Sequence, residues 1–159
     1  MSESEPLPTF TLSPGTVFGS AQPYLLSTLL GSCVAVCLWD RSHGGGGMTH
    51  SMLPRLRQNE RPSPLITDIA IDMLIEILTA EGCRIADLEA KLFGGGWVLG
   101  PRTAYPSIGD QNLEAARERL ACYRIPLVAE RLGGNGGLVL KQNTATGEVF
   151  VRPIAGVTW

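Results

Sequence analysis

A cysteine and a histidine that could act as nucleophile and base lie 17 residues apart in this chain. Cys33 directly follows Gly31 and Ser32, and His50 follows a glycine-rich stretch. A thiol becomes a strong nucleophile when it loses its proton, and a nearby imidazole can take that proton. Backbone N–H groups around Gly31 and Ser32 could stabilise the oxyanion of a tetrahedral intermediate. The pair therefore predicts acyl-transfer chemistry. From these residues alone, a buried structural Cys33 and a surface His50 are the more common arrangement.

The segments around this pair read as two strands of a hairpin. Residues 34–39 (Val-Ala-Val-Cys-Leu-Trp) are rich in β-branched and aromatic side chains, which favours a buried strand. Residues 48–53 are predicted to form a second strand that ends before Pro54, and the four glycines 44–47 between the two segments predict a turn. If the two strands pair, Cys33 and His50 come close together.

The rest of the chain supplies helices and further strands. Apolar residues recur at three- and four-residue spacing over 67–80, which predicts a helix. A second helix is predicted over 111–123, with Asp110 as its N-cap. Four more strands are expected at residues 90–93, 125–130, 138–142 and 148–152. This mixture predicts an α+β fold, a single-domain layered sandwich with helices packed on a largely antiparallel or mixed sheet.

Length and composition indicate one globular domain. The chain has 159 residues, 44% of them hydrophobic, and a formal net charge of −2, so neither disorder nor a nucleic-acid-binding surface is expected. Residues 1–12 are predicted to be a flexible N-terminal tail and residues 13–159 the domain.

The cysteines are expected to be free thiols in a reducing cytoplasm. The first residues carry no basic segment, and no apolar run is long enough to span a bilayer, so neither secretion nor membrane insertion is predicted. Cys37 is assigned to core packing. A zinc site made of Cys33, Cys37 and His50 is disfavoured because no second ligand pair has metal-site spacing. We predict no metal and no cofactor.

Several segments in a fixed order resemble the chemoreceptor glutamine deamidase family, CheD. The family carries a leucine-glycine-serine-cysteine-valine segment and, further on, a histidine in a His-x-Met-Leu-Pro segment. This chain has both, at residues 30–34 and 50–54. The similarity extends over most of the domain, through residues 90–95, 108–112, 125–130 and 132–135.

The resemblance implies a cytoplasmic enzyme that converts glutamine side chains of chemotaxis receptors to glutamate. Cys33 would be the nucleophile, His50 its base, and glutamyl methyl esters a further substrate. The family also pairs with a CheC-type phosphatase, so a non-catalytic or dual-role module that regulates such a phosphatase is the alternative. An unrelated thiol hydrolase of small amides is a third interpretation. Arg131 and Gly136-Gly137-Leu138 depart from the family pattern, which bears on docking more than on thiol chemistry.

The third member of the family's catalytic triad is a threonine six residues before the cysteine. That position is Ser27 here, and Thr28 is next to it. A shift of one residue along a strand would turn the side chain to the opposite face. Ser27 is therefore the favoured partner of His50, with Thr28 as the alternative.

Overall fold

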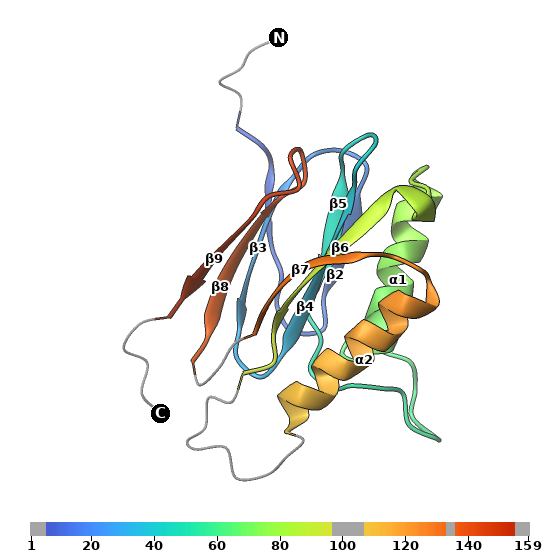
Figure 1. Ribbon diagram of the computed structural model, residues 1–159, viewed down its shortest axis with the longest axis vertical. Helices are drawn as coiled ribbons and strands as arrows, with labels where there is room; N and C mark the ends of the chain where they lie inside the picture. The colour runs from blue at the N-terminus through green and yellow to red at the C-terminus, as the bar shows by residue number, and fades with distance from the viewer. Residues whose placement is uncertain (1–5, 97–106, 133–135, 155–159) are drawn as a thin grey trace.

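The computed structural model describes residues 6–96, 107–132 and 136–154. Two helices cover one face of a five-stranded sheet, and a four-stranded sheet covers its other face (Figure 1). The predicted α+β layered sandwich is confirmed. Its β-structure forms two sheets, and both contain parallel as well as antiparallel pairs.

The five-stranded sheet has β4 at its centre. Its strand order is β2 (Val17–Ser20), β5 (Gly46–Thr49), β4 (Val34–Asp40), β6 (Leu88–Gly94) and β7 (Leu127–Leu132). β4 is antiparallel to both neighbours, and β7 is parallel to β6. The predicted hairpin between residues 34–39 and 48–53 is confirmed, because Cys37 pairs with Met48. The regular part of its second strand ends earlier than predicted, at Thr49.

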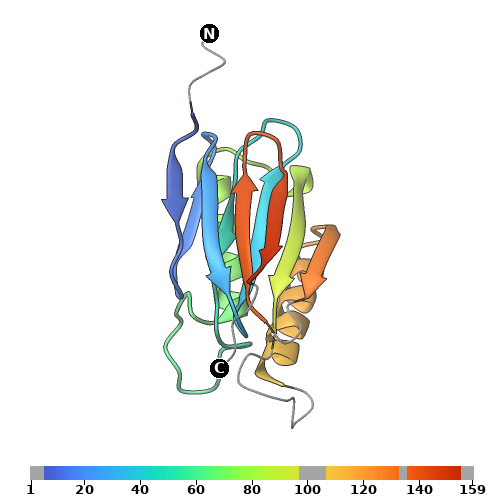
Figure 2. The same ribbon diagram turned by 90° about the vertical axis from the view of Figure 1, so that its left-hand side faces the viewer.

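The four-stranded sheet consists of β1 (Thr9–Thr11), β3 (Leu25–Leu30), β8 (Leu138–Asn143) and β9 (Val149–Pro153), in that order. Figure 2 shows it in front of the other sheet. β1 lies within the range predicted to be a tail, so the tail prediction is wrong for these residues. Thr9–Thr11 pairs in parallel with β3, and Leu12 is only 3% exposed.

β4 contributes to two hydrophobic cores because both of its faces are covered. Val34, Val36 and Leu38 pack toward the helices, whereas Ala35 and Cys37 pack between the sheets. A central strand covered on both faces reads as a continuous apolar run. Cys37 is a core residue, as predicted.

The helices are α1 (Thr67–Ala80) and α2 (Ile108–Cys122), and a short 3₁₀ helix, η1 (Ile85–Asp87), precedes β6. α1 has the predicted limits. α2 begins three residues earlier than predicted because Ser107 is its N-cap and Asp110 is the third helical residue. Each of these side chains accepts a hydrogen bond from the other residue's backbone N–H, at 3.1 and 2.9 Å. Neither helix in the described part of the chain is long and apolar enough to cross a membrane.

Candidate active site

Cys33 and His50 flank a backbone bridge between their two segments. Val34 and Ser51 exchange two hydrogen bonds, of 3.0 and 2.9 Å. Cys33 directly precedes Val34, and His50 directly precedes Ser51. In an antiparallel pair these two residues are diagonal neighbours, and their side chains lie on the face opposite to that of Val34 and Ser51. Such diagonal neighbours lie about 7 Å apart at their Cα atoms, within reach of long side chains. Cys33 is half-buried and packs against the inter-sheet core.

His50 points from the five-stranded sheet toward β3 of the facing sheet. Its side chain is 2% exposed. The ring nitrogen Nδ1 lies 2.7 Å from Oγ1 of Thr28, a buried hydroxyl on β3. The imidazole is therefore held between the two sheets.

The hydrogen bonds of Thr28 determine which ring nitrogen of His50 carries the proton. The Thr28 hydroxyl donates to the backbone carbonyl of Leu12 at 2.8 Å. A hydroxyl has one hydrogen, so toward His50 the Thr28 oxygen must accept, and Nδ1 must be the donor. Nε2 is then left with a free lone pair. Leu12 directly follows β1, so the first strand helps to fix this tautomer.

Ser27, the residue favoured from the sequence, does not make this contact. Its hydroxyl lies 3.0 Å from the hydroxyl of Thr11, on the exposed side of the sheet. Along β3 the buried positions are Leu26, Thr28 and Leu30, which face the other sheet. The preference for Ser27 is therefore wrong in geometry, and the alternative, Thr28, contacts the imidazole.

Burial sets the protonation states of the pair. Removal from water lowers the pKa of His50 from 6.5 to about 4. Burial also raises the pKa of the Cys33 thiol, and the residue's own backbone N–H opposes that rise only in part. At neutral pH the pair is accordingly a thiol beside a neutral imidazole.

The segment Gly31–Cys33 has its three carbonyl groups occupied. The Gly31 carbonyl accepts from Gly96 N–H at 3.0 Å and the Cys33 carbonyl from Gly95 N–H at 2.9 Å. The Ser32 carbonyl accepts from the Asn112 side chain at 3.3 Å. In the described parts of the chain, the N–H groups of residues 31–33 donate to no other residue. Backbone N–H groups are donors of the kind that can stabilise an oxyanion.

The contact between the glycines at 94–96 and Cys33 was not predicted from the sequence. A Cβ atom at Gly94 would lie 2.2 Å from the Cys33 carbonyl oxygen, and Gly94 has a φ of +105°. Only glycine satisfies both conditions. Asn112 entered the sequence analysis only through the family resemblance. A polar residue on the apolar face of a predicted helix was the signal that could have singled it out.

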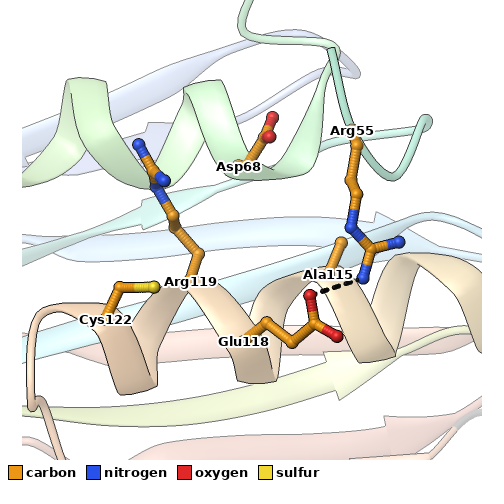
Figure 3. A pocket seen from close by; sticks show the side chains of 6 residues that line it. All are labelled: Arg55, Asp68, Ala115, Glu118, Arg119 and Cys122. Carbon is orange, nitrogen blue, oxygen red and sulfur yellow. Dashed lines mark hydrogen bonds and ion pairs between the residues drawn. The ribbon is translucent and has the colours of Figure 1, made fainter. Parts of the chain in front are cut away.

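A shallow pocket between the two helices is a structural feature separate from this pair (Figure 3). Its main charges are already paired. Arg55 bonds Glu118 at 2.8 Å, and Arg119 makes a bidentate pair with Asp72 at 2.6 and 2.7 Å. The exposed thiol of Cys122 also lines it. We assign the pocket to packing between the helices and the segment that carries Arg55.

Asp40, His43 and Asp87 are the one group in the described residues with metal-ligand geometry. Their ligand atoms lie within 4.8 Å of one another. The buried Asp40 carboxylate, however, already accepts from the backbone N–H groups of Ser42 and His43, at 2.8 and 3.0 Å, and so caps a turn. This cluster lies at the opposite end of β4 from Cys33.

The low pKa of His50 predicts a pH-dependent loss of stability. The unfolded chain binds a proton below about pH 6.5, but the folded site does not until about pH 4, so acid favours unfolding across that window. We expect the free energy of unfolding to fall by about 3 kcal/mol more in the wild type than in His50→Gln between pH 6.5 and 4. Urea titrations at several pH values measure this difference.

The control for this experiment is Ser27→Ala, which removes a hydroxyl that does not titrate, on the exposed side of β3, and keeps His50. It should retain the wild-type dependence on pH. If the free energy of unfolding changes equally with pH in the wild type and in His50→Gln, then His50 is not held neutral by burial.

Fold and site together define a class of protein. It is a layered α+β domain with a thiol before a central strand, a buried neutral imidazole diagonal to it, and a hydroxyl that holds the ring. This is the arrangement expected of a cysteine-dependent hydrolase.

Comparison with known proteins gives the family. Residues 52–153 match the family described as CheD chemotactic sensory transduction. A protein of Trichlorobacter lovleyi named "Probable chemoreceptor glutamine deamidase CheD" is 42% identical over 153 residues, which cover 95% of both chains. One of the same name from Rhodospirillum rubrum is 44% identical over 148 residues, 93% of this chain and 84% of the relative. This chain belongs to the CheD family. At this coverage the alignments include the Cys33–His50 segment, which lies before the matched family region.

Proposed function

We propose that this protein hydrolyses the side-chain amide of glutamine residues in chemoreceptors and so produces glutamate and ammonia. The relatives are named for this activity. The observation that carries the proposal is the hydrogen bonding of Thr28. Its bond to Leu12 leaves His50 Nε2 as an unprotonated acceptor on a ring that lies diagonal to Cys33.

The first step starts from the neutral pair. The Cys33 sulfur attacks the carboxamide carbon while its proton moves to His50 Nε2. The imidazolium keeps its Nδ1–H bond to Thr28. The carbonyl oxygen of the substrate becomes an oxyanion, and the backbone N–H groups of Ser32 and Cys33 stabilise it.

The second step releases the amine and restores the enzyme. His50 gives its Nε2 proton to the departing nitrogen, ammonia leaves, and a thioester to Cys33 remains. His50 then takes a proton from the water that attacks the thioester, the C–S bond breaks to give glutamate, and His50 returns that proton to the Cys33 sulfur, which restores the thiol and the neutral imidazole. A glutamyl methyl ester would follow the same course with methanol as leaving group. Side chains and water supply every proton transfer in this scheme.

The proposed setting is the cytoplasm, where the cytoplasmic domains of the receptors lie and where Cys33 stays reduced. Regulation of a CheC-type phosphatase is the second candidate function. The observation in its favour is the edge strand β7, where Val128 and Leu132 are about half exposed on either side of Arg131. An edge strand with exposed apolar side chains is suited to binding another protein.

The test is mass spectrometry of a receptor cytoplasmic fragment from the same organism, incubated with this protein. Each converted glutamine adds about one mass unit, because an amide NH₂ becomes an OH. Peptide mapping then locates the change, and a fragment with the mapped glutamines replaced by asparagine is the control. No mass change in any receptor fragment, together with tight binding to a CheC-type phosphatase, would favour the second candidate. Conversion of free glutamine alone would favour a small-amide hydrolase.

A further inference from the structure

Asn112 connects the segment of the nucleophile with the segment of the base. It lies on α2 and is fully buried. Its Nδ2 donates to the carbonyl of Ser32 at 3.3 Å and to the carbonyl of Met52 at 3.0 Å. Ser32 directly precedes Cys33, and Met52 is two residues after His50. One side-chain amide thus holds both segments at the N-terminal half of α2.

The other end of the Asn112 amide has no partner. Oδ1 is buried and accepts no hydrogen bond from the described residues. Because both partners of the side chain are carbonyl oxygens, the nitrogen must face them and the orphaned oxygen must face away. A buried acceptor without a partner opposes stability. An apolar residue would avoid this cost, so packing does not explain the amide, whereas its two donated hydrogen bonds do.

The bond to Ser32 acts on a peptide group that belongs to the candidate oxyanion site. In a trans peptide the C=O and the following N–H point in opposite directions. A Ser32 carbonyl turned toward Asn112 therefore turns the Cys33 N–H away from α2. That N–H lies near the Cys33 thiol. We propose that Asn112 is a positioning residue that aims the Cys33 N–H at the oxyanion, through the peptide group it shares with the Ser32 carbonyl. This inference rests on the proposed function.

The start of α2 is rigidly placed for this task. A Cβ atom at Gly109 would lie 2.2 Å from the Gly95 carbonyl oxygen, so the helix sits directly on the glycine turn. Within that turn, the Gly95 N–H donates to the Cys33 carbonyl. The capping box at Ser107 fixes the first turn of the helix. Asn112 is therefore presented from an element that cannot shift without disturbing the nucleophile segment.

The experiment compares Asn112→Ala and Asn112→Asp with the wild type in steady-state deamidation of a receptor fragment. Because the Cys33 N–H remains but loses its alignment, we expect kcat to fall ten- to a hundredfold for Asn112→Ala while KM stays within threefold. Asn112→Asp sets a carboxylate against two carbonyl oxygens and should lose at least as much. Ala116→Gly, one turn further along the buried face of α2, is the matched control. It weakens the helix and should leave kcat within twofold. Circular dichroism at the assay temperature verifies folding.

A second readout does not depend on activity. In ¹H–¹⁵N spectra the Cys33 amide signal should shift strongly in Asn112→Ala and little in Ala116→Gly. A folded Asn112→Ala with wild-type kcat, or an unshifted Cys33 amide, overturns the positioning role. If the wild type itself converts no receptor glutamine, the proposed function fails, and the amide shift still decides whether Asn112 orients this peptide group.

Discussion

Replacement of Cys33 by alanine is expected to lower the rate of receptor deamidation by at least about 10⁴-fold, and His50→Gln by at least about 10³-fold. The first variant removes the atom that would form the thioester. The second removes a base from the same face of the strand pair, beside a thiol whose pKa burial has raised. Without His50 the imidazole that would take the thiol proton during the attack is missing.

The double variant distinguishes a joint mechanism from two separate effects. If the thiol and the imidazole act as one unit, Cys33→Ala/His50→Gln should be no slower than Cys33→Ala alone. Initial rates from intact mass spectrometry of the receptor fragment measure all three variants. Cys122→Ser removes the exposed thiol at the end of α2 and should stay within twofold of the wild type. Residual activity of Cys33→Ala above about one per cent would mean that another group is the nucleophile.

The parts of the fold that follow from local pattern could be predicted from the sequence. α1 has a clear helical period and begins and ends where expected, at Thr67 and Ala80. The hairpin of β4 and β5 was predicted from an apolar run, a glycine-rich turn and a second strand before Pro54, although Gly46 and Gly47 belong to β5 and not to the turn. Its register places Cys33 and His50 on one face, which is why the sequence alone was enough to predict their proximity.

The orientation of β3 could not be predicted in the same way. The strand reads Leu-Leu-Ser-Thr-Leu-Leu, so each of its two faces carries leucines and one hydroxyl. Alternation of apolar and polar residues normally identifies the buried face of a strand, but here both faces look alike. The buried face of β3 is determined by the five-stranded sheet that packs against it, where His50 hydrogen-bonds Thr28. Family spacing pointed to Ser27 and was misleading by one residue.

The contribution of β1 was invisible for a different reason. A strand of three residues has no measurable period, and its partner β3 is 16 residues away. The carbonyl of Leu12 that accepts the hydrogen bond of the Thr28 hydroxyl is a backbone group, which no residue type reveals. The glycines at 94–96 likewise act through their N–H groups. Backbone donors and acceptors of a site become apparent only when the chain is folded.

Thr28→Val is expected to reduce kcat by about 10²- to 10³-fold, whereas Ser27→Ala should leave it within twofold. Valine has the shape of threonine but cannot accept from Nδ1, so the Nδ1–H tautomer loses its stabilisation. The alternative tautomer carries its proton on Nε2 and cannot receive one from Cys33. The Ser27 hydroxyl bonds the Thr11 hydroxyl on the outer side of the sheet, the face of β3 opposite to His50.

Thr28→Ser is the matched control, because it keeps the hydroxyl and removes only a methyl group. It should retain kcat within about threefold of the wild type, since the bonds to Leu12 and His50 can both form. The three variants are compared by initial deamidation rates, and ¹⁵N shifts of the imidazole report the tautomer in each. If Ser27→Ala loses activity and Thr28→Val keeps it, then Ser27, the position that family spacing indicates, orients His50 instead of Thr28. Loss in both Thr28→Val and Thr28→Ser, with an unchanged tautomer, would assign the effect to packing between the sheets and leave the imidazole to be oriented by another group.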